Sequence, residues 1–150
     1  MNMPIRYVIA ALMLALIIAP VMATEPGEYV PATVVYDVSS ADPSRFMQIL
    51  DRVSLLQTIY GSDPFTASIV IVIHEGAIPL LAKGTRKHHP NLANRARDLA
   101  MGEVIQFRLC QASATMQGYG HDDFEGFIKL VPMADAEIVR LQYDGYAYLH

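Results

Sequence analysis

Five consecutive β-branched apolar residues, Ile-Val-Ile-Val-Ile at positions 69–73, constrain the fold of this chain more than any other segment. Because neighbouring side chains of a strand point to opposite faces of a sheet, a strand of these residues is apolar on both faces. Such strands are typical of parallel sheets that are covered by helices on both sides. The segment therefore predicts an α/β fold built on a mainly parallel sheet.

The rest of the chain alternates between strand and helix patterns, as such a sheet requires. Strands are predicted at residues 32–38, 68–74, 104–109, 128–131 and 146–149. Helices are predicted at residues 43–60, 77–82, 92–101, 111–116 and 134–143, with Ser39, Ser40 and Asp42 as candidate caps of the first of them and Pro43 suited to its first turn. The pattern predicts one α/β domain with a sheet of about five strands and helices on both faces.

The first 23 residues predict a secretory signal peptide. They carry 19 apolar residues, a single basic residue (Arg6) and no acidic residue, and Pro20 follows an apolar run at residues 7–19. Small side chains at Val21 and Ala23 favour cleavage after Ala23. The alternative is an uncleaved membrane anchor, but the apolar run is shorter than the roughly 20 residues that span a bilayer. We therefore expect a mature domain at residues 24–150 that is periplasmic or secreted and no longer associated with the membrane.

Composition excludes several classes of protein. The single cysteine can form neither an internal disulfide nor a four-cysteine zinc site. Fifteen acidic residues against 11 basic ones give a net charge of −4, which offers no general electrostatic reason to bind nucleic acid. Walker, G-x-S-x-G, G-x-G-x-x-G and H-E-x-x-H motifs are missing, and the adjacent His88 and His89 lack further ligands. The sequence therefore predicts no cofactor and no metal.

Two residues whose side chains can take part in catalysis lie at the ends of predicted strands. Parallel strands share one edge at their carboxyl ends, so His74 and Cys110 are expected at the same edge, although the sequence does not say whether their strands are neighbours. N–H groups at the start of the short helix after Cys110 favour its thiolate, which is the nucleophile of sulfur chemistry. The alternatives are a buried thiol that only fills space and a histidine with a structural hydrogen bond.

Four segments carry a resemblance to a known family. They are residues 34–38, the run 71–77 around His74, the strand 104–110 that ends in the cysteine, and the ending at residues 131–148. In these segments the chain resembles the DsrE/DsrF-like family over residues 33–150. The resemblance implies a flavodoxin-like three-layer fold, assembly into trimers or hexamers, and sulfur carried as a persulfide on Cys110.

Two features depart from that family. Glu75 stands between the histidine and the glycine where many relatives have His-Gly, and it is expected to make the pocket less favourable to a thiolate. The predicted export excludes sulfur relay to cytoplasmic tRNA, so any partner would be an exported sulfur donor or acceptor. The sequence leaves two hypotheses: a sulfur carrier or sulfurtransferase-like protein in which His74 assists proton transfer to and from Cys110, or a non-catalytic oligomeric binding protein of the same fold.

Overall fold

The computed structural model describes residues 29–150. The predicted signal peptide at residues 1–23 lies outside the described residues and stays a prediction. Within the described part of the chain, no helix combines the length and the apolar character needed to cross a bilayer.

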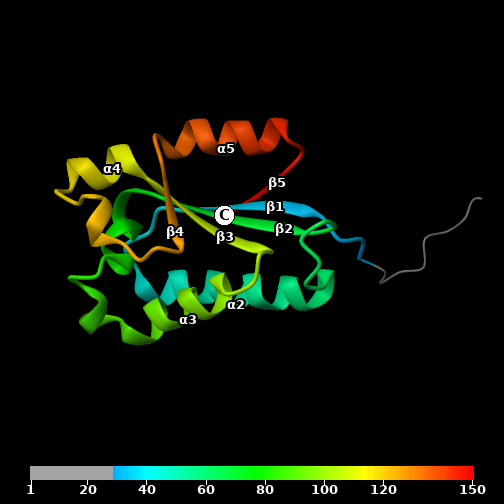
Figure 1. Ribbon diagram of the computed structural model, residues 1–150, viewed down its shortest axis with the longest axis horizontal. Helices are drawn as coiled ribbons and strands as arrows, with labels where there is room; N and C mark the ends of the chain where they lie inside the picture. Colours follow the sequence, from blue (N-terminus) through cyan, green and yellow to red (C-terminus); the bar gives the residue numbers. More distant parts are fainter. Residues whose placement is uncertain (1–28) are drawn as a thin grey trace, which may run out of the picture.

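A five-stranded sheet forms the middle layer of the molecule, in the order β4-β3-β2-β1-β5 (Figure 1). The strands are β1 (Thr33–Val38), β2 (Ser68–Ile73), β3 (Ile105–Cys110), β4 (Ile128–Val131) and β5 (Ala147–Leu149). All neighbouring strands are parallel, and Ile73 pairs with Leu109 across β2 and β3. The predicted parallel sheet of about five strands is confirmed, and β2 and β3 prove to be neighbours.

Helices cover both faces of this sheet. Figure 1 shows α2 (Pro43–Tyr60) and α3 (Pro90–Ala100) below it and α5 (Ala134–Tyr143) above it, with the short α4 (Gln111–Met116) at one end. The central strand β2 is buried on both faces, as its apolar run predicts: Ile69, Ile71 and Ile73 pack in the larger core on the α2 side, and Val70 and Val72 pack in the smaller core under α5. The three-layer flavodoxin-like α/β arrangement is confirmed.

Individual residues determine how α2 begins and why the segment after β2 is a 3₁₀-helix. Asp42 caps α2 by accepting a hydrogen bond from the Ser44 N–H at 2.8 Å, as the sequence predicts. The segment after β2 is a 3₁₀-helix, η1 (Glu75–Leu81), where a short helix is predicted at residues 77–82. Pro79 lacks an N–H and cannot continue an α-helical ladder, which favours the tighter turns. Two further 3₁₀ turns, η2 (Arg86–His88) and η3 (His121–Asp123), lie in the loops that follow η1 and α4.

Candidate functional site

The carboxyl ends of β2 and β3 meet at a small pocket of about 240 Å³. His74, which follows β2, and Cys110, which ends β3, both line it, so the expectation that they share one edge of the sheet is confirmed. Residues from the two flanking helices complete the wall, and the full lining is His74, Glu75, Cys110, Ala112, Ser113, Met116, Met133, Ala134 and Asp135.

Cys110 is held where two helices begin. It is both the last residue of β3 and the N-cap of α4, and its Sγ accepts a hydrogen bond from the Ser113 N–H at 3.4 Å. β4 runs beside β3 with Val131 opposite Cys110, and this pairing brings the start of α5 at Ala134 against the same sulfur. Cys110 is 3% exposed, so it is a buried residue, and it lines the pocket.

N–H groups around the sulfur favour its charged form. Burial raises the pKa of the Cys110 thiol, but hydrogen bonds from the side chain and backbone of Ser113 and from the backbone N–H groups of Ala134 and Ala112 lower it. The net pKa lies below the ordinary value for cysteine. Because α4 has six residues, these local N–H groups matter more than the dipole of a long helix. The arrangement stabilises a thiolate, the reactive form of cysteine.

His74 is held by a carboxylate from the neighbouring strand. Its Nε2 lies 2.6 Å from Oδ1 of Asp37, near the end of β1, and its backbone N–H donates to the Val38 carbonyl at 3.0 Å. The other carboxylate oxygen of Asp37 accepts the hydroxyl of Tyr148, also at 2.6 Å. Three side chains from β1, β5 and the end of β2 therefore form one hydrogen-bonded chain that reaches the pocket.

Glu75 extends from the backbone turn that follows His74. Its φ of 49° lies in the left-handed region, which is unusual for a residue other than glycine. Its side chain is 70% exposed, lines the pocket, and places Oε1 3.9 Å from Nδ1 of His74. Its backbone carbonyl accepts a hydrogen bond from the Gln117 side chain at 2.8 Å, which ties the residue after α4 to the start of η1.

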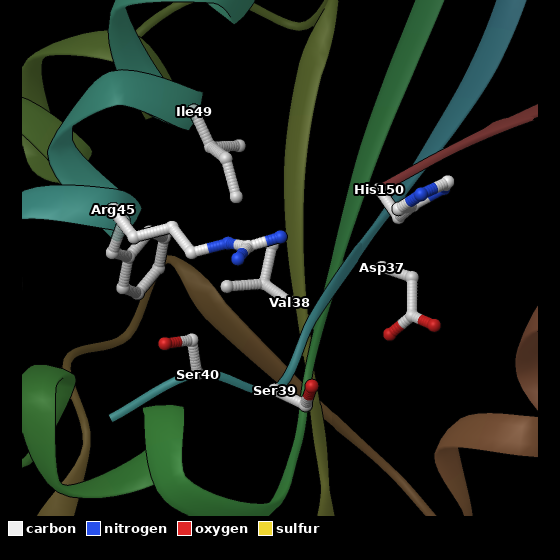
Figure 2. A pocket seen from close by; sticks show the side chains of 8 residues that line it. Asp37, Val38, Ser39, Ser40, Arg45, Ile49 and His150 are labelled. Atoms are coloured by element: carbon white, nitrogen blue, oxygen red, sulfur yellow. The ribbon is translucent and has the colours of Figure 1, made fainter. Parts of the chain in front are cut away.

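A second hollow of about 240 Å³ lies at the same edge of the sheet, beyond the end of β1. Figure 2 shows Arg45 reaching into it from α2 on one side of β1, with Asp37 and His150 on the other side. Because Asp37 also bonds to His74, it stands between this hollow and the cysteine pocket. The two hollows have no lining residue in common.

The other histidines are not brought to Cys110. His88 and His89 line a separate hollow of about 400 Å³ beside the start of α2, and His121 lies in η3. Among residues 29–150, no cluster of three or more His, Cys, Asp or Glu side chains is arranged to hold a metal ion.

Sequence reasoning anticipated the N–H groups that follow Cys110 but missed three groups of the site: Asp37, Ala134 and Tyr148. A polar residue near the end of an apolar strand was a signal for Asp37. No local pattern marks Tyr148 or Ala134, because their roles depend on how distant strands and helices are placed.

Comparison with known proteins gives a family and a fold. The family model described as the DsrE/DsrF-like family matches residues 35–150. The solved structure of a protein of unknown function from Methanobacterium thermoautotrophicum is similar, with a TM-score of 0.67 and 21% sequence identity, over 79% of this chain and 97% of that one. At this identity the likeness shows the fold alone. A search of curated proteins gave no match.

Proposed function

The chain belongs to the DsrE/DsrF-like family, and we propose that it is a sulfur carrier or sulfurtransferase-like protein that holds a persulfide on Cys110. The observation that carries the proposal is the position of the thiol: a cysteine with a lowered pKa, surrounded by N–H groups, at the base of a pocket on the carboxyl edge of a parallel sheet. Family membership supports a role related to sulfur relay.

The proposed step is an exchange at sulfur. The Cys110 thiolate attacks the outer sulfur of a donor persulfide, R–S–SH, which forms a new S–S bond on Cys110 and breaks the S–S bond of the donor. The donor leaves as R–S⁻ and takes a proton, so the products are the Cys110 persulfide and R–SH. Passage of the outer sulfur to an acceptor thiol reverses this exchange and needs no separate oxidant or reductant.

Mass spectrometry tests the proposal. After incubation of the purified protein with a low-molecular-weight persulfide, we expect a gain of one sulfur atom on the peptide that contains Cys110. The Cys110→Ser variant should gain none. A wild-type protein that gains no sulfur under these conditions refutes the sulfur-carrier role.

The buried position of Cys110 allows a test between the sulfur carrier and the alternative, a non-catalytic binding protein. Because Cys110 is 3% exposed, native labelling decides whether the pocket admits a reagent. Labelling of Cys110 in the folded protein supports the sulfur carrier. A thiol that reacts only after denaturation would instead favour a non-catalytic oligomeric binding protein of the same fold.

Export and assembly complete the proposal. We propose that the protein leaves the cytoplasm after cleavage at Ala23, assembles into a homotrimer or hexamer, and exchanges sulfur with an exported donor or acceptor protein. Amino-terminal sequencing of the exported chain should begin at Thr24, and a chain that keeps residue 1 would contradict cleavage.

A further inference from the structure

The two ring nitrogens of His74 have different roles: Nε2 is hydrogen-bonded to Asp37, and Nδ1 is available for proton transfer. An ionised carboxylate only accepts hydrogen bonds, so the 2.6 Å contact with Asp37 requires the proton on Nε2 of His74. In neutral His74 the lone pair then lies on Nδ1. Nδ1 is on the side of Glu75, which lines the cysteine pocket, at 3.9 Å from its Oε1.

Tyr148 orients the carboxylate of Asp37, which in turn orients His74. Its hydroxyl donates to the Asp37 oxygen that His74 does not use, and this hydrogen bond raises the pKa of the Tyr148 hydroxyl. With both oxygens engaged, Asp37 cannot turn away from His74 without losing a bond. The side chain of His74 is 13% exposed and that of Asp37 is 22% exposed, so water competes little for the contact between these two, whereas Tyr148 is 41% exposed.

The pocket holds few other groups that could supply a proton. In the part of the chain that the structure describes, its lining contains no lysine and no arginine, and its charged residues are the carboxylates Glu75 and Asp135. The hydrogen-bonding groups of Ser113 are directed to the Cys110 sulfur. The titratable groups that face His74 are therefore Asp37 from β1 and Glu75 from η1, with Cys110 and Asp135 across the pocket.

We propose that Asp37 and Tyr148 are positioning residues that hold His74 with its proton on Nε2 and its Nδ1 toward the Cys110 pocket, where Nδ1 takes the thiol proton and returns it to the leaving sulfur. The proposal rests on the proposed function for the identity of the leaving group. It assigns roles to two residues that lie 111 positions apart in the chain.

The proton and electron pairs balance. Nδ1 of His74 removes the proton of the Cys110 thiol, and the thiolate attacks the outer sulfur of R–S–SH. The electron pair of the broken S–S bond leaves with R–S⁻. The Nδ1 proton then passes to R–S⁻, which gives R–SH and returns His74 to its neutral form. Throughout these steps one carboxylate lies beside each ring nitrogen, Asp37 at Nε2 and Glu75 at Nδ1.

The first test is the tautomer of His74, observed by two-bond ¹H–¹⁵N correlation of the imidazole rings in the purified protein. We expect His74 to carry its proton on Nε2. In Asp37→Asn the new amide can donate to Nε2, which should move the proton to Nδ1. A wild-type His74 protonated on Nδ1, or a tautomer that Asp37→Asn leaves unchanged, overturns the proposal.

The second test separates proton return from access to the thiol. Dimethyl disulfide and methyl methanethiosulfonate are small and neutral, and both place an S–CH₃ group on Cys110. The first expels methanethiolate, which needs a proton, and the second expels a sulfinate, which does not. We expect Asp37→Asn to slow the dimethyl disulfide reaction about 10-fold and Tyr148→Phe about 3-fold, with a smaller slowing of the methanethiosulfonate reaction, which needs removal of the thiol proton but not its return.

Controls make the result specific. Tyr29→Phe and Asp98→Asn alter an exposed tyrosine and an exposed aspartate that take no part in the hydrogen bonds among Tyr148, Asp37 and His74, and both should leave the two rates unchanged. In a His74→Gln background, Asp37→Asn should have no further effect on the rate ratio, because its influence passes through the histidine. Equal slowing with both reagents would show that His74 does not return the proton to the leaving sulfur and would overturn the proposal.

The two proposals can fail separately, because neither of these tests requires a persulfide. Selective slowing in a protein that gains no sulfur refutes the sulfur carrier and sustains the positioning role. Sulfur loading in a protein without selective slowing sustains the sulfur carrier and refutes the positioning role.

Discussion

Arg108 is a buried charge that lies two residues before Cys110 on β3. Its side chain is 10% exposed and pairs with Glu137 of α5, which is 12% exposed and also bonds to Arg140 at 3.0 Å. The Nε of Arg108 is buried without a hydrogen-bond partner among residues 29–150. The pair therefore joins the strand that carries Cys110 to the helix whose first residue, Ala134, directs its N–H at the Cys110 sulfur, and Arg108 depends on Glu137 for compensation of its charge.

Glu137→Gln should lower the free energy of unfolding by about 2–4 kcal/mol at neutral pH, because it leaves the buried Arg108 charge uncompensated. Hydrogen bonds from Arg140, then from Arg108, hold the pKa of the Glu137 carboxyl below its ordinary value. The stabilisation is therefore full above the pKa of the unfolded chain and is lost as pH falls through the lower, folded pKa.

Urea unfolding at a series of pH values measures this dependence. The difference between wild type and Glu137→Gln should shrink as pH falls below the ordinary glutamate value of 4.5. Glu103→Gln, at an exposed position before β3, is the matched control and should follow the wild type at every pH. A constant difference across the series would show that the carboxylate charge is not the cause.

The site residues differ in how far the sequence alone could place them. Cys110 and His74 are predictable, because each ends an apolar strand and parallel strands share an edge. Asp37 and Tyr148 are not, because their bond joins β1 to an edge strand at the far end of the chain. The expected effect of Glu75 on the thiolate stays a prediction: its side chain is at the pocket, directed toward solvent and His74.

At the scale of elements, η1 is held against the loop after β1 by a glycine. A Cβ on Gly76 would lie 3.0 Å from Ala41 Cβ, 3.1 Å from the Ala41 nitrogen and 3.1 Å from the Ser39 carbonyl oxygen. Two of these three atoms belong to the backbone and cannot rotate away. The absence of a side chain therefore sets how closely the His74-Glu75 turn approaches the loop that leads into α2.

Gly76→Ala should lower the free energy of unfolding by about 1–3 kcal/mol, because it forces backbone segments apart in a packed region. Gly84→Ala is the matched control, since a Cβ there meets nothing within 4 Å. Thermal or urea unfolding of both variants measures the difference. Equal stability of the two would contradict close packing at Gly76.

Most elements are predictable from sequence for a simple reason: β2, β3 and α2 have periodic apolar patterns that agree with their final burial. The 3₁₀ geometry of η1 was not predicted, because an apolar run that contains Pro79 does not distinguish a 3₁₀-helix from a short α-helix. The order of the strands could not be predicted either. It depends on β5 returning to pair with β1, which no local pattern records.

At the scale of the whole molecule, α5 does not cover all of its side of the sheet. Its main packing partners are β1 and β2, while Gln106 of β3 and Lys129 of β4 remain exposed. Tyr143, at the end of α5, is 88% exposed. The tyrosine-rich tail at residues 143–150 runs into β5, at the opposite edge of the sheet from β3 and β4. An exposed tyrosine at one edge and a partly covered face at the other favour contacts between subunits over exposure to water.

We therefore predict a trimer or a hexamer at micromolar concentration, measured by light scattering coupled to size exclusion. Replacement of Tyr143 by serine should weaken the assembly if the tail forms the contact, whereas replacement of the exposed Phe65, in the loop between α2 and β2, should not. A wild-type protein that stays monomeric under these conditions would contradict the prediction.

The strand that carries Tyr148 has a consequence for local unfolding. β5 has three residues and lies at the edge of the sheet, where its one pairing partner among residues 29–150 is β1, so its opening free energy is expected to be among the lowest of the strands. Each opening of β5 withdraws the Tyr148 hydroxyl and leaves Asp37 to hold His74 unaided. The fraction of molecules with a fully oriented site is then set by the fraying of this short strand, and any partner that pairs with its free edge would raise that fraction without touching the pocket.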